Sequence, residues 1–93
     1  MDSVTVKSAA RVLEVFEYLS ERRGPATVTE IADALGYPQS STSVLMKCLC
    51  SLGYLSQDPL TRAYRPTTRV AQLGNWVGLA ETHVRLIDAI HSD

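Results

Sequence analysis

The 93-residue chain is short and nearly neutral: 45% of its residues are hydrophobic, 20% are charged, and nine basic against ten acidic residues give a net charge of −1. This length suits one small domain, and the composition is typical of a folded chain. No apolar run approaches the ~20 residues that a membrane span needs, and residues 1–7 lack the features of a signal peptide, so we expect a cytoplasmic protein. The spacing of the cysteines (48 and 50) and of the histidines (83 and 91) is not that of a metal site, and no cofactor is expected.

The charges are unevenly distributed along the chain. Residues 38–69 carry four basic residues and one acidic residue, whereas residues 1–37 and residues 70–93 each have a net charge of −2. The overall charge argues against a dedicated nucleic-acid binder, because phosphate contacts are made largely by clustered lysine and arginine. The basic middle segment is therefore where phosphate contacts are expected.

The first half of the chain predicts two helices. Over residues 8–22, apolar residues at helical spacing form one stripe, with Ser8 as a suitable N-cap and Gly24 as part of the stop signal: Ala9, Val12, Leu13, Phe16 and Leu19. The second helix begins with a capping box, in which the Thr27 hydroxyl and the Glu30 carboxylate accept hydrogen bonds from each other's backbone amides. Its buried stripe is Ile31, Ala32 and Leu35, and Gly36 ends it. A helix of about two turns is too short to be stable alone, so we expect it to pack against the rest of the domain.

A third helix over residues 38–52 completes a helix-turn-helix. Pro38 suits its first position. A helical projection turns one set of residues inward: Ser41, Leu45, Cys48, Leu49 and Leu52. The outward set is polar and free of acids, with Gln39 and Val44 on its flanks: Ser40, Ser43, Lys47, Cys50 and Ser51. The projection thus predicts Cys48 as a core residue and Cys50 as a surface thiol. An acid-free, hydroxyl-rich face suits phosphates and base edges, although an ordinary solvated face remains the alternative.

The second half of the chain predicts a hairpin and a long helix. Residues 54–57 and 62–65 are interpreted as strands around a turn at residues 58–61, with Arg62 near the tip and Pro66 closing the second strand. Thr67 or Thr68 caps a helix whose apolar stripe runs from Val70 to Ile87, with a break expected near Gly74. This stripe either pairs with a partner helix or folds back on the first helix.

Several short runs together carry a family resemblance over about residues 6–74: Lys7-Ser8-Ala9-Ala10-Arg11-Val12-Leu13, Thr29-Glu30-Ile31-Ala32, Gly36-Tyr37-Pro38-Gln39-Ser40-Ser41, Leu49, Leu52, Gly53-Tyr54-Leu55, Tyr64 and Leu73-Gly74. In order and spacing they resemble the N-terminal winged helix-turn-helix domain of IclR-type transcriptional regulators. The resemblance implies a recognition helix over residues 38–52, a wing over residues 53–66, and dimeric bacterial regulators with a second, effector-binding domain.

The sequence departs from the family's pattern in three places. Val44 stands where a basic residue is common, and Arg65-Pro66-Thr67 replaces the usual Leu-Gly after the wing tyrosine. The sequence ends at Asp93, so the family's effector domain is expected to be absent from this chain.

The predicted fold is mainly α: a winged helix-turn-helix with a three-helix core and a two-stranded β-wing over residues 1–66, then a C-terminal helical linker or dimerisation segment over residues 67–93. The predicted function is sequence-specific binding of double-stranded DNA by a homodimeric transcriptional regulator, with the recognition helix in the major groove and the wing on adjacent backbone or minor groove. The candidate DNA contacts are Gln39, Ser40, Ser41, Ser43, Val44, Lys47, Arg62 and Arg65. The alternative is a winged-helix interaction module that does not bind DNA. An enzyme is not expected, because no catalytic constellation appears at usable spacing.

Overall fold

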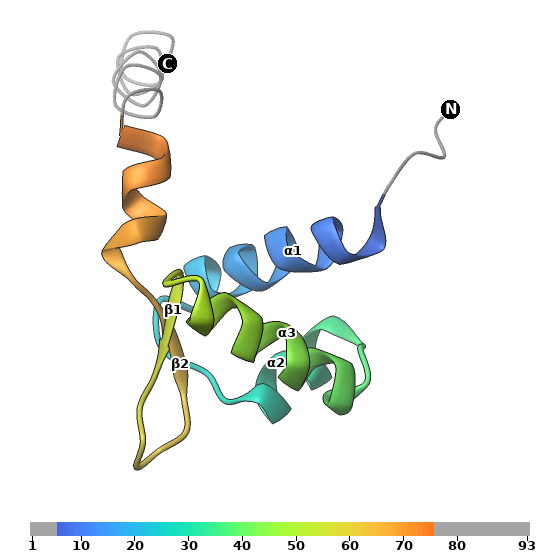
Figure 1. Ribbon diagram of the computed structural model, residues 1–93. Coiled ribbons are helices and arrows are strands. Elements are labelled where there is room, and N and C mark those ends of the chain that lie inside the picture. The colour runs from blue at the N-terminus through green and yellow to red at the C-terminus, as the bar shows by residue number, and fades with distance from the viewer. Residues whose placement is uncertain (1–5, 76–93) are drawn as a thin grey trace, which may run out of the picture.

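In the computed structural model, which describes residues 6–75, three helices pack into one body and a two-stranded sheet projects from it (Figure 1). The elements are α1 (Lys7–Arg22), α2 (Val28–Leu35), α3 (Gln39–Ser51), β1 (Leu55–Gln57) and β2 (Tyr64–Pro66). A further helix begins after β2 and is described over residues 68–75. This arrangement confirms the predicted winged helix-turn-helix.

Helix α1 differs from its prediction at both ends and in the face that it buries. It begins after Val6, which makes no side-chain capping bond, so Ser8 is not the N-cap. It ends at Arg23, which adopts the left-handed conformation (φ 60°) one residue before Gly24, and whose N–H donates to the Leu19 carbonyl at 2.9 Å. Its buried residues are Val15 and Leu19, while Leu13, predicted to face inward, is 63% exposed. Three members of the predicted stripe do face the core, because Leu19 is buried and Val12 and Phe16 pack against the core, but the predicted stripe omitted the buried Val15.

The capping box of α2 is present as predicted. Thr27 Oγ1 accepts a hydrogen bond from the Glu30 amide at 3.2 Å, and the Thr27 amide donates to Glu30 Oε1 at 2.8 Å. Gly36 ends the helix in the left-handed region (φ 74°). The bond from the Thr27 amide, helped by Arg22, holds the pKa of Glu30 below its ordinary value. The Glu30 carboxylate therefore contributes its full stabilisation of the fold near neutral pH, and this contribution is lost as the pH falls through the lowered pKa of Glu30.

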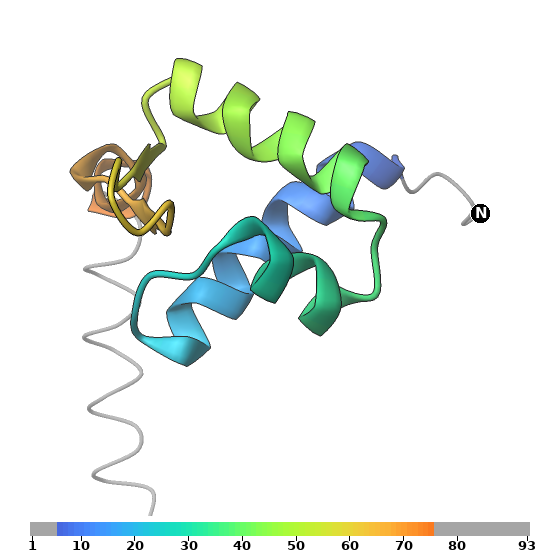
Figure 2. The same cartoon turned by 90° about the horizontal axis from the view of Figure 1, so that it is seen from below.

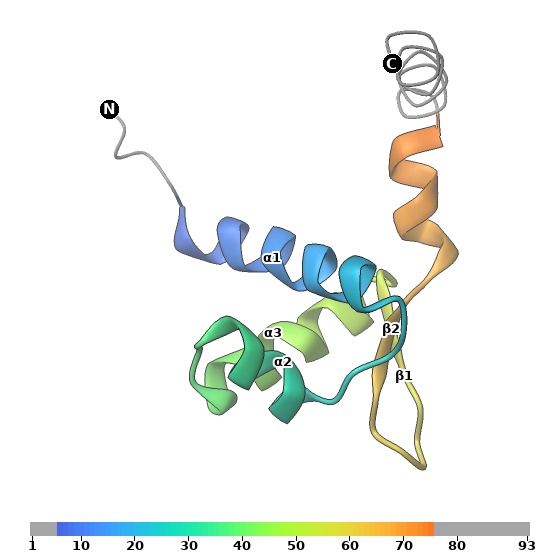
Figure 3. The ribbon, with the colours of Figure 1, turned by 180° about the vertical axis from the view of Figure 1, so that it is seen from behind.

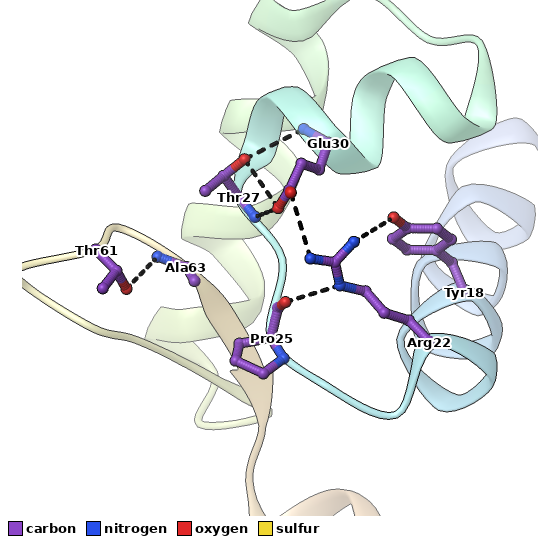
Figure 4. Close-up of polar contacts among 7 residues, drawn as sticks. All are labelled: Tyr18, Arg22, Pro25, Thr27, Glu30, Thr61 and Ala63. Carbon is purple, nitrogen blue, oxygen red and sulfur yellow. Dashed lines mark hydrogen bonds and ion pairs between the residues drawn. The ribbon is translucent and has the colours of Figure 1, made fainter.

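One arginine ties the end of α1 to the start of α2 (Figure 4). The Arg22 guanidinium donates to Glu30 Oε2 at 3.3 Å, to the Tyr18 hydroxyl at 3.1 Å and to the Pro25 carbonyl at 2.8 Å. Because the same carboxylate closes the capping box, the position of α2 relative to α1 is fixed by directional polar contacts as well as by apolar packing.

The second strand of the wing is hydrogen-bonded on both sides, to β1 on one side and to the helical body on the other. β1 and β2 are antiparallel, with Ser56 opposite Arg65 and Gln57 opposite Tyr64. On the other side of β2, Ala26 exchanges two backbone hydrogen bonds with Tyr64, at 2.7 and 3.1 Å. Ala26, Leu55 and Tyr64 are buried in the core, whereas Ser56 and Arg65 are exposed. The sheet therefore has one inner and one outer face.

The C-terminal helix begins where the sequence predicts. Thr67 caps it, because Thr67 Oγ1 accepts a hydrogen bond from the Arg69 amide at 3.2 Å. The helix continues through Gly74 to residue 75, so the break expected near Gly74 does not fall within the described residues. Trp76 and the remainder of the predicted apolar stripe lie outside the described residues.

Replacing Arg23 by glycine is expected to stabilise the domain relative to Arg23→Ala. Glycine adopts the left-handed conformation without the steric cost that a Cβ adds, a difference of about 1 kcal/mol. Both variants remove the same charge, so the comparison isolates the backbone conformation. Urea unfolding followed by circular dichroism measures the difference, and equal free energies of unfolding would contradict the assignment of Arg23 as the left-handed cap.

Candidate nucleic-acid interface

The rotation of α3 about its own axis decides which of its side chains face solvent. Thr42, Met46 and Leu49 are buried. The predicted inward face is thus wrong by roughly a quarter turn. Cys48 is exposed and Cys50 is half-buried, the reverse of the prediction. The error has a physical reason: α3 carries apolar residues on nearly every side, so periodicity alone does not select the side that packs.

The solvent-facing side of α3 holds most of the predicted contacts. Gln39, Ser40, Val44 and Lys47 are exposed, and no acidic residue lies in the helix. Seen from below in Figure 2, α3 runs along one side of the helical body.

The other two predicted contacts on α3 are less accessible. Ser41 and Ser43 are half-buried, and the Ser41 hydroxyl already donates to the Pro38 carbonyl at 3.2 Å. Ser41 is therefore neither fully buried, as the helical projection predicts, nor fully free to contact DNA.

The N-terminus of α3 lacks a side-chain cap. Its N-cap is Pro38, which makes no side-chain capping bond, and the first turn contains no acidic residue. The first amides of any helix have no partner within the helix, and the helix dipole places partial positive charge there. An anion is therefore electrostatically favoured at the start of α3.

Two cations beside this end of α3 were missed from the sequence. Lys7 and Arg11 line a shallow pocket with Tyr37, which immediately precedes Pro38. The Arg11 guanidinium lies 4.3 Å from the centroid of the Tyr37 ring, a cation–π contact. The signal was in the sequence, but summing charge over residues 1–37 hid it, because the acidic residues of that segment outnumber the basic ones.

The Tyr37 ring is itself held in place by α1. The Tyr37 hydroxyl donates a hydrogen bond to the Glu14 carboxylate, and this bond is the main reason that the pKa of Tyr37 is raised. Glu14 and Arg11 both belong to α1, so one helix fixes the ring from its hydroxyl and from its face. The orientation of Arg11 thus depends on the turn that leads into α3.

The wing tip is a hydrogen-bonded loop that directs Arg62. Asp58 Oδ1 accepts from the Leu60 amide at 2.7 Å and from the Thr61 amide at 3.2 Å, and these bonds lower the pKa of Asp58. The Arg62 amide donates to the Asp58 carbonyl at 2.8 Å, and Arg62 adopts a positive φ of 66°. Thr61 Oγ1 also accepts from the Ala63 amide, as Figure 4 shows. Arg62 is thus an exposed residue on a loop whose backbone is held by hydrogen bonds.

Arg65 lies apart from the recognition helix. It projects from the outer face of β2 and lines a pocket with Arg23 and residues 24–25, at the end of α1. Figure 3 shows this end of α1 beside β2. The structure thus brings Gln39, Ser40, Val44 and Lys47 together on α3 but does not bring Arg65 to them.

A three-helix core whose third helix is open to solvent, followed by a two-stranded wing, defines the class of winged helix-turn-helix DNA-binding domains. The chain belongs to the IclR helix-turn-helix domain family, whose model matches residues 8–59. It carries the DNA-binding domain of an IclR-type transcriptional regulator. Members of this family are regulators and not enzymes, as predicted.

Individual relatives agree with this assignment. The chain is 26% identical over 72 residues to the HTH-type transcriptional regulator XynR of Escherichia coli K12, covering 77% of this chain and 29% of that protein. An IclR family transcriptional regulator from Brucella abortus superposes with a TM-score of 0.72 at 34% identity, covering 78% of this chain and 28% of that one. A transcriptional regulator of the same type from Alicyclobacillus acidocaldarius gives 0.71 at 29% identity, covering 76% and 29%. The chain therefore spans less than a third of the length of these relatives.

Two further observations concern only residues 6–75. No helix in that range has the length and apolar character required to cross a membrane. No group of three or more histidine, cysteine, aspartate or glutamate side chains in that range is arranged to hold a metal ion.

The two cysteines of α3 provide a direct measure of its rotation. Cys48 is exposed, whereas burial raises the pKa of the Cys50 thiol, and the thiolate is the reactive form. In Cys50→Ala and Cys48→Ala variants, each keeping one thiol, we expect Cys48 to react with iodoacetamide at least about tenfold faster than Cys50. Mass spectrometry of timed samples gives both rates. Faster alkylation of Cys50 would favour the helical projection over the structure.

Proposed function

We propose that this domain binds double-stranded DNA sequence-specifically, with α3 in the major groove and the wing on the adjacent backbone or minor groove. The observation that carries the proposal is the open face of α3: it is acid-free, begins at an uncapped helix N-terminus, and is flanked there by Lys7 and Arg11. A regulator acting on bacterial DNA would work in the cytoplasm.

On α3, the candidate residues divide by chemistry into base readers and phosphate contacts. The amide of Gln39 can pair with adenine through two hydrogen bonds, and Ser40 can bond to any base edge. Val44, 69% exposed, offers an apolar contact to a thymine methyl group where a basic residue is common in the family. Lys47 is a long cation suited to phosphate. Ser41 and Ser43 would contact DNA only from the edge of this face.

Phosphate binding would be shared between the two ends of the interface. At the start of α3, the free amides would hold one backbone strand together with the Arg11 guanidinium, which stacks on Tyr37 two residues before the helix. At the wing, Arg62 is carried by an ordered tip and suits a neighbouring phosphate or the minor groove. Arg65 would contribute only where DNA extends to the outer face of the wing.

Variants of the interface should separate sequence preference from affinity. On a duplex selected from a random pool, Gln39→Ala is expected to cost roughly 1–3 kcal/mol and to relax preference at one or two base pairs. Arg62→Ala and Arg11→Ala should weaken preferred and random duplexes alike, and each should reduce the slope of log K against log salt by about one unit per subunit. Fluorescence anisotropy over a range of salt concentrations measures both effects.

The control for this experiment removes a buried side chain instead. Leu49→Ala is expected to destabilise the fold by roughly 2–5 kcal/mol through a core cavity, so its loss of binding tracks unfolding. Salt-dependent binding of the wild type to no duplex at all would contradict the DNA proposal and favour the interaction module.

We also propose that two copies associate through α1 and the C-terminal segment, with residues 1–66 as the DNA-binding unit and residues 67–93 as the linker or dimerisation segment. Leu13, Phe16 and Val70 line a groove between α1 and the C-terminal helix, and Leu13 and Leu73 are each 63% exposed. Exposed leucines are typical of an association surface, and the remaining residues that line the groove are polar: Glu17, Ser20 and Glu21. Pairing would also double the number of phosphate contacts.

Sedimentation equilibrium at micromolar concentration is expected to give about twice the 10.2 kDa chain mass. Leu13→Glu should return the protein to a monomer, because it places a charge in the groove without disturbing the core. Val44→Ser removes an equally exposed apolar side chain from α3 and should leave the mass unchanged. A wild-type monomer under these conditions would contradict the dimer.

A further inference from the structure

The first residues after the wing are bonded to the chain that leaves α3. Thr67 Oγ1 donates a hydrogen bond to the Gly53 carbonyl at 2.6 Å, and the Thr67 amide donates to the Tyr54 carbonyl at 3.1 Å. The same hydroxyl oxygen accepts from the Arg69 amide, which starts the C-terminal helix. One threonine therefore both caps this helix and holds it to residues 53–54.

Gly53 and Tyr54 are in turn bonded to the last turns of α3. The Gly53 amide donates to the Cys50 carbonyl at 3.0 Å, and the Tyr54 amide donates to the Leu49 carbonyl at 2.9 Å. Residues 53 and 54 thus lie between the end of α3 and the start of the C-terminal helix in space, and hydrogen bonds connect them to both helices.

Arg69 closes the joint from the outside. Its guanidinium lies 5.0 Å from the centroid of the Tyr54 ring, a cation–π distance. Its Cδ lies 3.4 Å from where a Cβ on Gly53 would stand, and Gly53 has a φ of 89°. Glycine therefore gives the chain its turn and leaves room for Arg69 to lie against it. The last turn of α3 has no basic residue of its own, so Arg69 also brings positive charge towards the negative end of that helix.

These contacts matter because the described part of the C-terminal helix has little other attachment. In residues 68–75, Val70 is half-buried and the remaining residues are exposed. Figure 1 shows this helix leaving the base of the wing in the direction opposite to the wing tip. A change in the direction of the helix would therefore act on the end of α3 and the base of the wing through this joint.

We propose that Thr67 and Arg69 are positioning residues for DNA binding, which set the angle between the C-terminal helix and α3. Any interaction that reorients the C-terminal helix would then also change how α3 meets the bases. The inference rests on the proposed DNA binding and adds to it a route by which that binding is regulated. Neither side chain needs to touch DNA. The Thr67–Arg69 joint (Thr67 and Arg69 with Gly53 and Tyr54) carries the coupling.

The test compares variants that open the joint without changing its bulk. Thr67→Val removes both hydroxyl bonds and leaves the charge unchanged. We expect it to weaken binding to the preferred duplex by at least about fivefold, since two hydrogen bonds are lost, while binding to a random duplex and the salt slope stay close to wild type. Thr68→Val makes the same change one residue later, at an exposed side chain, and should have no effect.

The cation–π contact is tested by a double-mutant cycle. Arg69→Met and Tyr54→Leu should each weaken binding to the preferred duplex by a similar factor, and the double variant should be no weaker than either single variant, because both break one contact. Effects that multiply, or a Thr67→Val variant that binds its preferred duplex as the wild type does, would overturn the proposal. A fall in salt slope in Arg69→Met that Arg69→Lys restores would also overturn it, because Arg69 would then be a phosphate contact.

Hydrogen exchange separates failure of this inference from failure of the proposed function. If the joint exists, Thr67→Val should accelerate exchange of the Arg69 amide, which loses its acceptor Thr67 Oγ1, with no large change in the thermal unfolding midpoint. Faster exchange together with a wild type that binds no duplex would refute the DNA proposal, and the positioning role with it, while leaving the joint itself in place. Faster exchange with unchanged DNA affinity would refute the positioning role alone.

Discussion

The rotation of α3 in the core is the constraint on which the rest of the structure depends. Met46 is fully buried, as are Ile31 of α2 and Val15 of α1, and all three side chains belong to one core cluster. A close-packed core tolerates little change of volume, and turning α3 by one residue would replace Met46 with a side chain of different shape. This packing places Val44 and Lys47 in solvent, and with them the surface that the domain presents to a ligand.

Directional contacts then fix what packing leaves adjustable. The Arg22 network sets α2 against α1, the Ala26–Tyr64 bridge sets the sheet against the body, and residues 53–54 join α3 to both the wing and the C-terminal helix. Each of these connections is made by hydrogen bonds, either between backbone groups or from the Arg22 guanidinium. Because a hydrogen bond weakens steeply when its distance or angle changes, these connections resist small displacements. A short domain with a modest core gains precision of orientation from them.

Most elements with local signals were predicted correctly, although Ser8 is not the N-cap of α1, and the prediction failed where packing decides. The Thr27–Glu30 box, Gly36 and the Thr67 cap depend on residues within one turn, and the structure has all three. The inward face of α3 could not be read, because Leu45, Met46 and Leu52 point in different directions and only the neighbouring helices select among them. The position of Lys7 and Arg11 was missed for a related reason: the fold, and not sequence distance, brings them to Tyr37 at the start of α3.

The near-neutral charge of the chain bears on how a DNA-binding domain of this kind would work. The cations proposed to meet DNA lie in three separate places: beside the start of α3, at Lys47 and on the wing. Counterion release from so few phosphate contacts would give weak non-specific binding, so base contacts and the proposed pairing of two copies would supply more of the affinity. Under that condition the angle of α3 matters more than it does in a strongly basic protein. A joint that holds the end of α3 to the C-terminal helix therefore acts where the binding free energy is most sensitive to geometry.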